Sequence, residues 1–427
     1  MSTRIEPLTR VEGEGEIVLY VDDHGVTRNV ELRIVEAPRF FEHIVKGLHY
    51  TMIPDIVSRI CGFCGVSYIL TAVKAFENCM SINVSEKVET YRELVHLAER
   101  IKSHVLHIAL LNLPDLLGLK NILELESRNP RILENVFKVL SLVDRLMKLT
   151  GGRFHNVVNI RVGGVFRLPE STTIKRIEET VTKELLPLFT ELAEFVLGLE
   201  TMPRIKHSVK YCTIAGEKYP GSGTALYFNG SRYSADLFYE KLVDVQQKPG
   251  KNNLVYRFKG EGYVVGPIAR FNNYRGQLLS ETRSLLEKYG WYKELENVYQ
   301  SIVARTAEVY DALHRIPLML DQIRGITETP AVLTGRVEPG HCFYATEAPR
   351  GILYQRFTLN EKGHVVGANI VTPTAQNIAL AEDLAKREAC GLKAEESIGV
   401  VQRVVVSFDP CISCSVHQLK ISIVRSH

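Results

Sequence analysis

Two pairs of cysteines carry the strongest chemical signal in this sequence. Cys61 and Cys64 lie in the segment RICGFCG, and Cys411 and Cys414 lie in DPCISC, near the other end of the chain. Two intervening residues let both sulfurs of a pair face one ion, and soft thiolates bind zinc, nickel, copper or iron–sulfur centres. The spacing therefore predicts a metal or redox site.

The spacing alone leaves three interpretations open: a functional metal site, a structural zinc site, and redox-active thiols. A structural four-cysteine zinc site usually takes its pairs from neighbouring segments. Here the pairs lie near opposite ends of the chain, so most of the chain must fold before the site can close. This separation favours a functional metal centre within an enzyme core.

Acidic, guanidinium and imidazole groups in short apolar segments are further candidates. Glu12 lies in LTRVEGEG, Glu42 in EAPRFFEHI and Arg350 in EAPRG, while His104 and His107 are one helical turn apart in SHVLH. Each has a commoner structural role, as a solvated or ion-paired acid, a surface arginine or a core histidine. None of them defines a site by itself.

The composition is that of a folded protein with balanced charge. The 427 residues include 52 Lys and Arg and 49 Asp and Glu, and 45% are hydrophobic. This balance gives no electrostatic case for nucleic-acid binding. The sequence contains no apolar run of the roughly 18–20 residues that a membrane span needs, no secretory signal core and no nucleotide-binding glycine motif. We expect a cytoplasmic protein whose cysteine thiols stay reduced.

Long amphipathic segments predict a helical core around the cysteines. Leu94, Leu97, Ile101, Val105 and Ile108 recur at helical spacing and form one apolar stripe. Starting and stopping signals such as Ser, Asn-Pro and Gly-Gly delimit the predicted helices. The long ones span 85–114, 129–152, 172–200, with a kink near Pro187, and 294–316, and shorter ones span 38–47, 67–80 and 375–391.

Alternating apolar segments predict small β elements at both ends of the chain. Two strands flank a turn at Asp23–Gly25, and a hairpin spans 351–373 around Asn360–Gly363. Residues 205–265 are rich in Gly, Tyr, Ser and Lys, which predicts an irregular or β-containing insertion. The predicted fold class is α+β, mainly α, with a central long-helix bundle carrying the metal site and small β elements from the N-terminal segment and the late hairpin.

Seven motifs together resemble the large, catalytic subunit of nickel–iron hydrogenases. They are LTRVEG, PRFFE, RICGFCG, GGRFH, EAPRG, VTPTAQN and DPCISCSVH, in the family's order from Thr9 to His417. The resemblance implies one large-subunit domain over 1–427. Its parts are an N-terminal β/α segment (1–50), a helical core (51–204), the insertion (205–265), a region of helices, hairpin and second cysteine motif (266–417) and a removable extension (418–427).

The resemblance implies a nickel–iron centre that cleaves dihydrogen reversibly and heterolytically. By position in the motifs, Cys61 and Cys411 would be terminal ligands of nickel, and Cys64 and Cys414 would bridge nickel and iron. The iron would carry carbon monoxide and cyanide ligands. Soft thiolates suit such metals.

Further catalytic roles follow from the same resemblance. Glu12 matches a glutamate that receives a proton from the terminal thiolate, here Cys411. Arg350 matches an arginine above the open metal position, with Asp115 and Asp409 as its carboxylate partners.

The resemblance also implies cofactor contacts and a second cation. The residues lining the cofactor would be Ala348, Pro349 and Thr374, of which Thr374 would bond a cyanide ligand. A magnesium-type ion would be bound by Glu42, His417 and the backbone carbonyl of Ile370, and such oxygen-rich ligands suit a hard cation.

One further position departs from the family pattern, and one further segment matches it. The first cysteine motif usually ends in a histidine that donates a hydrogen bond to a bridging sulfur, and here that position is Tyr68. A tyrosine hydroxyl also donates but does not gain charge near neutral pH. The tail Gln418–His427 corresponds to an extension that a maturation protease removes after nickel insertion.

The resemblance implies protein partners and leaves rival functions. The partners would be an iron–sulfur small subunit, further electron-transfer subunits, a maturation protease and nickel-insertion proteins. The motif style is most like the cytoplasmic bidirectional group linked to NAD(P), coenzyme F420, heterodisulfide or sulfur. The rivals are a hydrogen-sensing regulatory subunit, a non-hydrogenase relative that acts as a coupling module, and a structural four-cysteine zinc protein.

Overall fold

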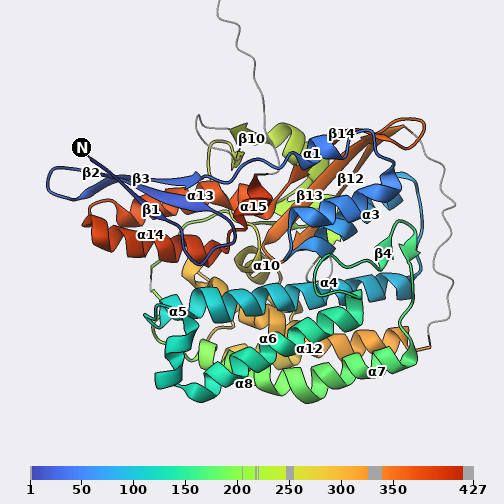
Figure 1. The fold of residues 1–427 in the computed structure, drawn as a ribbon, viewed down its shortest axis with the longest axis horizontal. Helices are drawn as coiled ribbons and strands as arrows, with labels where there is room; N and C mark the ends of the chain where they lie inside the picture. The colour runs from blue at the N-terminus through green and yellow to red at the C-terminus, as the bar shows by residue number, and fades with distance from the viewer. Residues whose placement is uncertain are drawn as a thin grey trace, which may run out of the picture.

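A helical half and a sheet-containing half make up the molecule in Figure 1. The computed structural model describes residues 2–203, 205–216, 219, 221–246, 254–325 and 339–416. The long helices lie together at the bottom of the view, and the sheets with α3, α13 and α14 lie above them. This arrangement confirms the predicted fold class.

The helical half is built on α4 (Glu86–Leu106), α6 (Pro130–Gly151), α8 (Leu186–Leu197) and α12 (Ser301–Ile323). The Ser85 hydroxyl accepts the Val88 N–H at the start of α4, and the Asn129 side chain caps α6 in the same way. The predicted apolar stripe of α4 is buried along its whole length. Burial of this stripe against α6 and α12 supplies the helix with most of its stability.

Prolines change two predicted helices without ending them. The helix predicted to stop at Pro114 continues through a π-helical turn, His107–Asn112, into α5 (Leu113–Leu116). Likewise, α7 (Ser171–Glu179) runs through a π-helical turn into α8, which has Pro187 in its first turn. A proline lacks the N–H of a helix interior, and a wider turn accommodates the carbonyl that its ring would otherwise meet.

An antiparallel sheet near the N-terminus consists of β1 (Ser2–Pro7), β2 (Gly15–Val21) and β3 (Thr27–Ile34), in that order. The predicted turn joins β2 to β3, whereas β1 was not predicted. Two helices pack on this sheet, α13 (Pro373–Ala389) against β3 and α14 (Ala394–Phe408) against β2. The sequence predicts α13 but not α14.

A second antiparallel sheet has the order β14-β13-β12-β7, with α3 (Gly65–Cys79) packed on it. The predicted hairpin is β13 (Gly351–Leu359) and β14 (Val365–Val371), and its turn is confirmed. The strand β12 (Gly340–Ala348) pairs with β13, so the turn that contains Arg350 lies where these two strands meet, at one end of the sheet. Gly351 is required there, because its φ is +136° and a Cβ would lie 2.4 Å from Val265.

Shorter elements connect these parts. The remaining strands are β4 (Ile160–Arg161), β5 (Gly164–Val165), β6 (Cys212–Ile214), β7 (Ser222–Gly223), β8 (Ala225–Phe228), β9 (Ser231–Ser234), β10 (Val243–Gln246) and β11 (Val255–Phe258). The remaining α-helices are α1 (Phe41–Ile44), α2 (Ile53–Val57), α9 (Ala235–Leu237), α10 (Pro267–Tyr274), α11 (Ser280–Lys288) and α15 (Ile412–Ser415). Within the described ranges, none of the helices has both the length and the apolar character that crossing a membrane requires.

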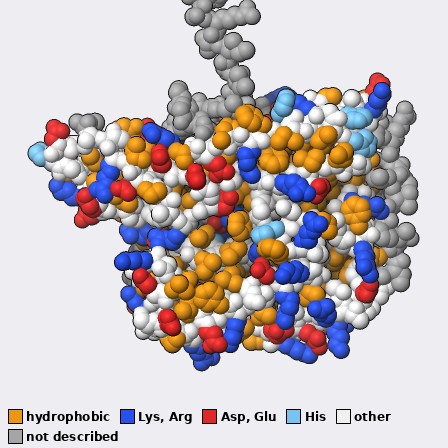
Figure 2. Space-filling view, in the orientation of Figure 1, with side chains coloured by type: hydrophobic (Ala, Val, Ile, Leu, Met, Phe, Trp, Pro, Cys, Tyr) orange, Lys and Arg blue, Asp and Glu red, His pale blue; other side chains and the backbone are white. Residues whose placement is uncertain are grey.

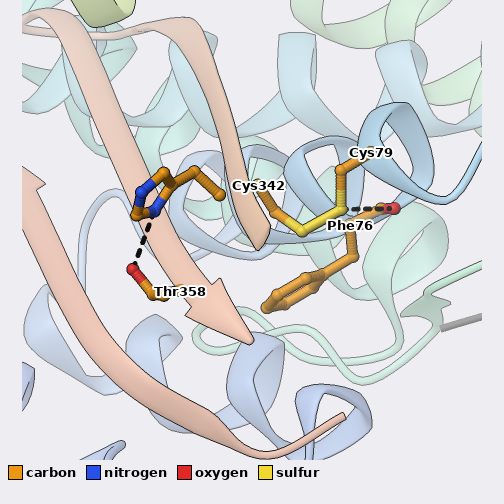
Figure 3. Close-up of a disulfide and its surroundings, with 5 residues drawn as sticks. Phe76, Cys79, Cys342 and Thr358 are labelled. Atoms are coloured by element: carbon orange, nitrogen blue, oxygen red, sulfur yellow. Dashed lines mark hydrogen bonds between the residues drawn. A yellow bond between two sulfur atoms is a disulfide. The ribbon is translucent and has the colours of Figure 1, made fainter. Parts of the chain in front are cut away.

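A disulfide joins Cys79 to Cys342, as Figure 3 shows. Cys79 ends α3 and Cys342 lies on β12, where the packing of helix on strand brings their Cα atoms to 5.2 Å. The expectation that all cysteine thiols stay reduced is therefore wrong for this pair, because the two elements converge at a distance that suits a disulfide. The bond ties the helix that follows Cys64 to the strand that leads to Arg350.

Replacing Cys79 and Cys342 together by Ala is expected to lower the free energy of unfolding by about 2–5 kcal/mol. The reason is that the unfolded chain regains the freedom of a loop whose ends are 263 residues apart in sequence. Thermal unfolding measures the loss, and a non-reducing peptide map of the unaltered protein should contain the linked pair. The Cys390→Ala variant, which removes an exposed free thiol, is the control and should unfold like the unaltered protein. Equal midpoints for the double variant and this control would contradict the prediction.

Candidate metal centre

The structure brings the two cysteine pairs together in the core. The Sγ atoms of Cys61 and Cys411, 350 residues apart in sequence, are separated by 3.5 Å. The sulfurs of Cys61, Cys411 and Cys414 all lie within 4.8 Å of one another, and the Cys64 N–H donates to the Cys61 sulfur. All four cysteines are buried. No other group of three or more His, Cys, Asp or Glu side chains in the described ranges meets this spacing.

The second cysteine motif is positioned by a turn and by the N-terminal loop. Asp409 ends α14 in the left-handed conformation, which redirects the chain toward Cys411. The backbone at Glu12 forms a parallel bridge with Cys411, and the Ile412 N–H donates to the Glu12 carbonyl at 2.8 Å. A Cβ at Gly13 would lie 2.7 Å from Ile412, so the loop approaches this closely only with glycine.

The sulfurs are chemically prepared for a soft cation. Burial raises the pKa of the Cys411 and Cys414 thiols. The pKa of the Cys64 thiol is also raised, chiefly by its hydrogen bond with Cys61 and then by burial. Without a cation these thiols are therefore neutral, and metal binding displaces their protons. Four sulfurs that converge in a buried site fit nickel and iron better than a hard ion.

Glu12 contacts one of these sulfurs directly. Its Oε2 accepts the Cys411 thiol at 2.9 Å and the Ser413 N–H at 3.2 Å. The Glu12 side chain is only half-buried, so it connects the thiol to the exterior. This pair was predicted as donor and acceptor of a proton, and the structure brings the two groups to hydrogen-bond distance.

Arg350 lies against another sulfur and is held by Asp409. Its Nη1 donates to the Cys64 sulfur at 3.3 Å, its Nη2 to Asp409 Oδ1 at 3.1 Å and its Nε to the Asp409 carbonyl at 2.8 Å. Of the two predicted carboxylate partners, Asp115 is wrong, because its Oδ1 accepts from Arg10 instead. The π-helical turn before α5 places Asp115 beside the N-terminal loop.

The residues predicted to line the cofactor lie next to the cysteines in the network of hydrogen bonds. The Thr374 hydroxyl, in the first turn of α13, accepts the Cys411 N–H at 3.0 Å. The carbonyls of Ala348 and Pro349 each accept from Arg270 at 2.9 Å, which fixes the backbone just before Arg350.

Glu42, a predicted magnesium ligand, contacts the N–H of Ile370 and not the carbonyl that is predicted as the second ligand. Glu42 Oε1 accepts the Ile370 N–H at 2.6 Å, which joins α1 to β14. The third, His417, lies outside the described residues, as does the predicted extension 418–427.

Tyr68 is buried on the first turn of α3 and faces the cysteines. Within the part of the chain that the structure describes, its hydroxyl has no hydrogen-bond partner. Burial, and after it the charge of Cys414, raises the pKa of Tyr68 well above its ordinary value. The hydroxyl is therefore a proton donor whose acceptor would be a group held by the cysteines.

Glu99, on α4, is a site residue that the sequence did not indicate. Its carboxylate accepts the Val66 N–H at 2.6 Å and both the N–H and the hydroxyl of Ser67, at 3.0 and 2.6 Å. It thereby caps the start of α3, directly after Cys64. In the sequence it resembles a solvated acid on the polar face of α4, and no local signal marks it as buried.

The sequence matches a family model described as nickel-dependent hydrogenase over residues 39–141, and one described as HoxL-like over residues 2–37. The alpha subunit of sulfhydrogenase 2 from Pyrococcus furiosus is 32% identical over 428 residues, which cover 99% of this chain and 100% of the relative. The beta subunit of an NAD-reducing hydrogenase from Cupriavidus necator is 24% identical and covers 97% of this chain and 94% of its own.

Solved structures agree in fold. A crystal structure of an NAD+-reducing nickel–iron hydrogenase in the H2-reduced state superposes with a TM-score of 0.87. The two sequences are 21% identical, and the match covers 98% of this chain and 100% of the solved chain. The two molecules therefore share the fold along their whole length.

Glu99 predicts a pH dependence of stability. Burial raises the pKa of Glu99 to about 7, from an ordinary value of 4.5. Between these values the folded protein binds more protons than the unfolded chain, so the free energy of unfolding falls as the pH rises through this window. The contribution amounts to about 3 kcal/mol between pH 4 and pH 8.

The Glu99→Gln variant is expected to lose the part of the pH-dependent fall in the free energy of unfolding that Glu99 causes. The reason is that an amide does not titrate, while its oxygen still accepts an N–H. Unfolding midpoints at pH 5 and pH 8 measure the difference. The Glu93→Gln variant, at an exposed position on the same helix, should retain the decline. A Glu99→Gln protein with the pH dependence of the unaltered protein would contradict the prediction.

Proposed function

Because this chain belongs to the family of nickel-dependent hydrogenase large subunits, we propose that its four converging cysteines hold a nickel–iron centre for the reversible cleavage of dihydrogen. The observation that carries this proposal is the site itself. Four buried sulfurs from both ends of the chain meet beneath Arg350, and one of them donates to Glu12.

The donor set fits the proposed centre. Cys61 and Cys411 would be terminal ligands of nickel, and Cys64 and Cys414 would bridge it to iron. When bound, such a centre supplies soft, redox-active metals that polarise dihydrogen, favour its heterolytic cleavage and accept its electrons. Burial excludes bulk water from these groups and strengthens every electrostatic interaction with them.

Glu12 is the proposed proton acceptor. A thiol at Cys411 already donates to its carboxylate at 2.9 Å, so the proton needs no rearrangement to leave the sulfur. The Ser413 N–H bonds the same oxygen and keeps it aimed at the thiol. Since the side chain is half-buried, the proton reaches the exterior from there.

Arg350 provides a fixed positive charge beside the sulfurs. Asp409 binds it through two hydrogen bonds, and the Arg350 Nη1 donates to Cys64 and to the Ser103 hydroxyl. A guanidinium that is already held in place can stabilise negative charge at the reacting centre, and it does not have to move when that charge develops. Asp115 takes no part in this arrangement.

Thr374 is proposed to bond a cyanide ligand of iron, which with carbon monoxide completes the proposed cofactor. Its hydroxyl oxygen accepts the Cys411 N–H, so its own hydrogen remains to be donated. Ala348 and Pro349 are proposed to line the same region, and their carbonyls are already engaged by Arg270.

A magnesium-type ion is proposed at Glu42 and the carbonyl of Ile370, with His417 as a further ligand. The support is that the Glu42 carboxylate lies beside the backbone of Ile370, where it accepts the Ile370 N–H at 2.6 Å. Carboxylate and carbonyl oxygens with retained waters are the ligands that Mg²⁺ prefers.

Electrons must leave through a partner. Of the eight cysteines, four form the site and two form the disulfide, which leaves Cys212 and Cys390. An iron–sulfur cluster needs about four cysteine ligands. We therefore propose an iron–sulfur small subunit, with further electron-transfer subunits behind it. Apolar side chains gather on the face in Figure 2, over α6 and α8 and near α1, which supports a protein partner.

Likeness to the NAD-reducing relative favours a soluble electron acceptor and a cytoplasmic location. We also propose that nickel-insertion proteins load the site and that a maturation protease then removes 418–427. The intact mass of the purified, active protein tests this step, because a mature chain that still ends at His427 would exclude it.

Metal analysis and infrared spectroscopy of the purified complex test the proposed function. We expect nickel together with iron, the iron in excess because the partner subunits carry iron–sulfur clusters, with bands of bound carbon monoxide and cyanide, and turnover of dihydrogen. The Glu12→Gln variant should keep the metals and the bands and lose at least tenfold in turnover, since removing a general base costs about 10²–10⁴. Zinc alone would establish the structural alternative. Nickel, iron and bands without turnover would favour a sensor, and absence of nickel, of zinc and of the bands would favour a coupling module.

Tyr68 is expected to tune a bridging sulfur. Its buried hydroxyl has no acceptor among the described residues, and Cys414 is the charge that influences it most after burial. The Tyr68→Phe variant should keep its metals and shift the infrared bands, because a hydrogen bond to the sulfur is lost. The Tyr68→His variant should restore the bands and change oxygen inactivation. Identical bands in all three proteins would refute the proposed contact.

A further inference from the structure

His104 lies fully buried on α4, in a line of hydrogen bonds and one ion pair, between Arg305 and Asp409, that ends at Arg350. We propose that His104 is a positioning residue, a neutral imidazole that holds Arg305 on Asp409 and thereby fixes the Arg350 guanidinium above Cys64. This proposal rests on the proposed function, because it concerns the arginine beside the metal-binding sulfurs.

The partners of His104 determine its tautomer. Arg305 Nη1 lies 3.1 Å from His104 Nδ1, and a guanidinium can only donate, so Nδ1 accepts. His104 Nε2 lies 2.6 Å from Glu308 Oε2, and a carboxylate accepts, so Nε2 carries the hydrogen. The ring is therefore neutral and both of its nitrogens are engaged.

A charged side chain would not serve at this position. A protonated imidazole has no lone pair for Arg305 and would repel it. Burial lowers the pKa of His104 to about 3, so the neutral ring is the form present near neutral pH. The position therefore needs a neutral group that accepts on one side and donates on the other.

Arg305 transmits this constraint to Asp409. The same Nη1 lies 3.3 Å from Asp409 Oδ2, while Arg350 Nη2 donates to Asp409 Oδ1 at 3.1 Å. Two buried guanidinium groups thus share one carboxylate, one on each oxygen. If Arg305 left, Asp409 would be free to rotate, and Arg350 would lose the orientation that directs Nη1 to Cys64.

Glu308 is the common anchor of a second connection to the same arginine. Arg270 donates to both oxygens of Glu308, at 2.7 and 2.8 Å, and to the carbonyls of Ala348 and Pro349. Arg270 thus holds the backbone that precedes Arg350, while His104 acts on its side chain. Both connections begin at one buried carboxylate, so the backbone and the side chain of Arg350 are fixed in one frame.

The other histidine of the SHVLH segment has a different role. His107 Nε2 bonds the Val406 carbonyl at 2.7 Å, which ties α4 to α14. Among the described residues its Nδ1 has no partner, so it does not extend the line to Asp409.

The test compares His104→Phe with His104→Gln in the purified complex. Phenylalanine fills the space but neither accepts nor donates, whereas the glutamine amide does both. For His104→Phe we expect nickel and iron to be retained and KM to change little. We expect kcat for dihydrogen to fall at least tenfold, which corresponds to an activation free energy about 1.4 kcal/mol higher. His104→Gln should recover most of kcat. Unaltered kcat in His104→Phe would overturn the proposal.

His207 provides a matched control. It is also buried, its Nε2 bonds Glu388 at 2.7 Å and its Nδ1 accepts the Val298 N–H at 3.3 Å. Glu388 lies at the far end of α13 from Thr374, about 20 Å along the helix. His207→Phe should cost similar stability and leave kcat unchanged. An equal fall in kcat in both phenylalanine variants would overturn the proposal.

A double-variant cycle separates positioning from general damage. If His104 acts through Asp409, then His104→Phe should lower kcat by less than twofold in an Asp409→Asn background, whereas independent effects would multiply. Multiplying effects would overturn the proposal. If His104→Phe does not fold, the cycle is measured with His104→Asn, whose side chain is too short to contact Arg305 and Glu308 together, and the same outcomes decide.

A crystal structure of metal-free His104→Phe gives a readout that does not depend on turnover. Arg305 should leave Asp409 for Glu308, and Arg350 should move out of hydrogen-bond range of Cys64. An unmoved Arg350 would overturn the proposal even if the complex proved to contain no nickel, a result that would separately refute the proposed function.

Discussion

The burial of four thiols in one place is the constraint on which the rest of this structure depends. Neutral thiols can be buried at little cost, but a metal requires thiolates, and four negative sulfurs in the core are unstable without compensating charge. Arg350 supplies part of that compensation from within hydrogen-bond distance. Since Arg350 is itself buried, it in turn requires Asp409, and Asp409 faces a second guanidinium in Arg305. A site of this kind therefore demands a buried ionic framework around it.

That framework explains why the helical half carries so many polar groups. Arg270, Arg305, Glu308 and His104 project from α10, α12 and α4 into a region where apolar side chains would pack more simply. Each of them has at least one partner of opposite charge or a hydrogen bond to a neighbour, which is the condition under which buried charges are tolerated. Removing one partner would leave the next uncompensated, so the region responds to substitution as a unit.

The sequence predicts those parts of the molecule that leave local signals. Caps at Ser85 and Asn129, the stripe of α4 and the turn at Asn360–Gly363 give the helices and the hairpin with nearly correct ends. Strand β12 and helix α14 were missed; in β12 the last four residues are all buried, which removes the alternation that marks a half-buried strand. Glu99 and Arg305 were missed for a related reason, since a charged residue in a long helix looks solvated until its tertiary partner is known. Asp115 was assigned to Arg350 by likeness, and the π-helical turn before it gives it to Arg10 instead.

The disulfide between α3 and β12 divides the surroundings of the cysteines into two unequal sides. Cys64 and Arg350 belong to elements that are joined covalently and by sheet packing. Cys411 and Cys414 lie at α15, which is attached to the N-terminal loop through the backbone of Glu12 and to α13 through the side chain of Thr374. The first side is held together by a covalent bond and by packing, and the second side, held by hydrogen bonds, covers it. Under the proposed function, we expect the metals to meet the covalently tied side first and the C-terminal side to close the site last.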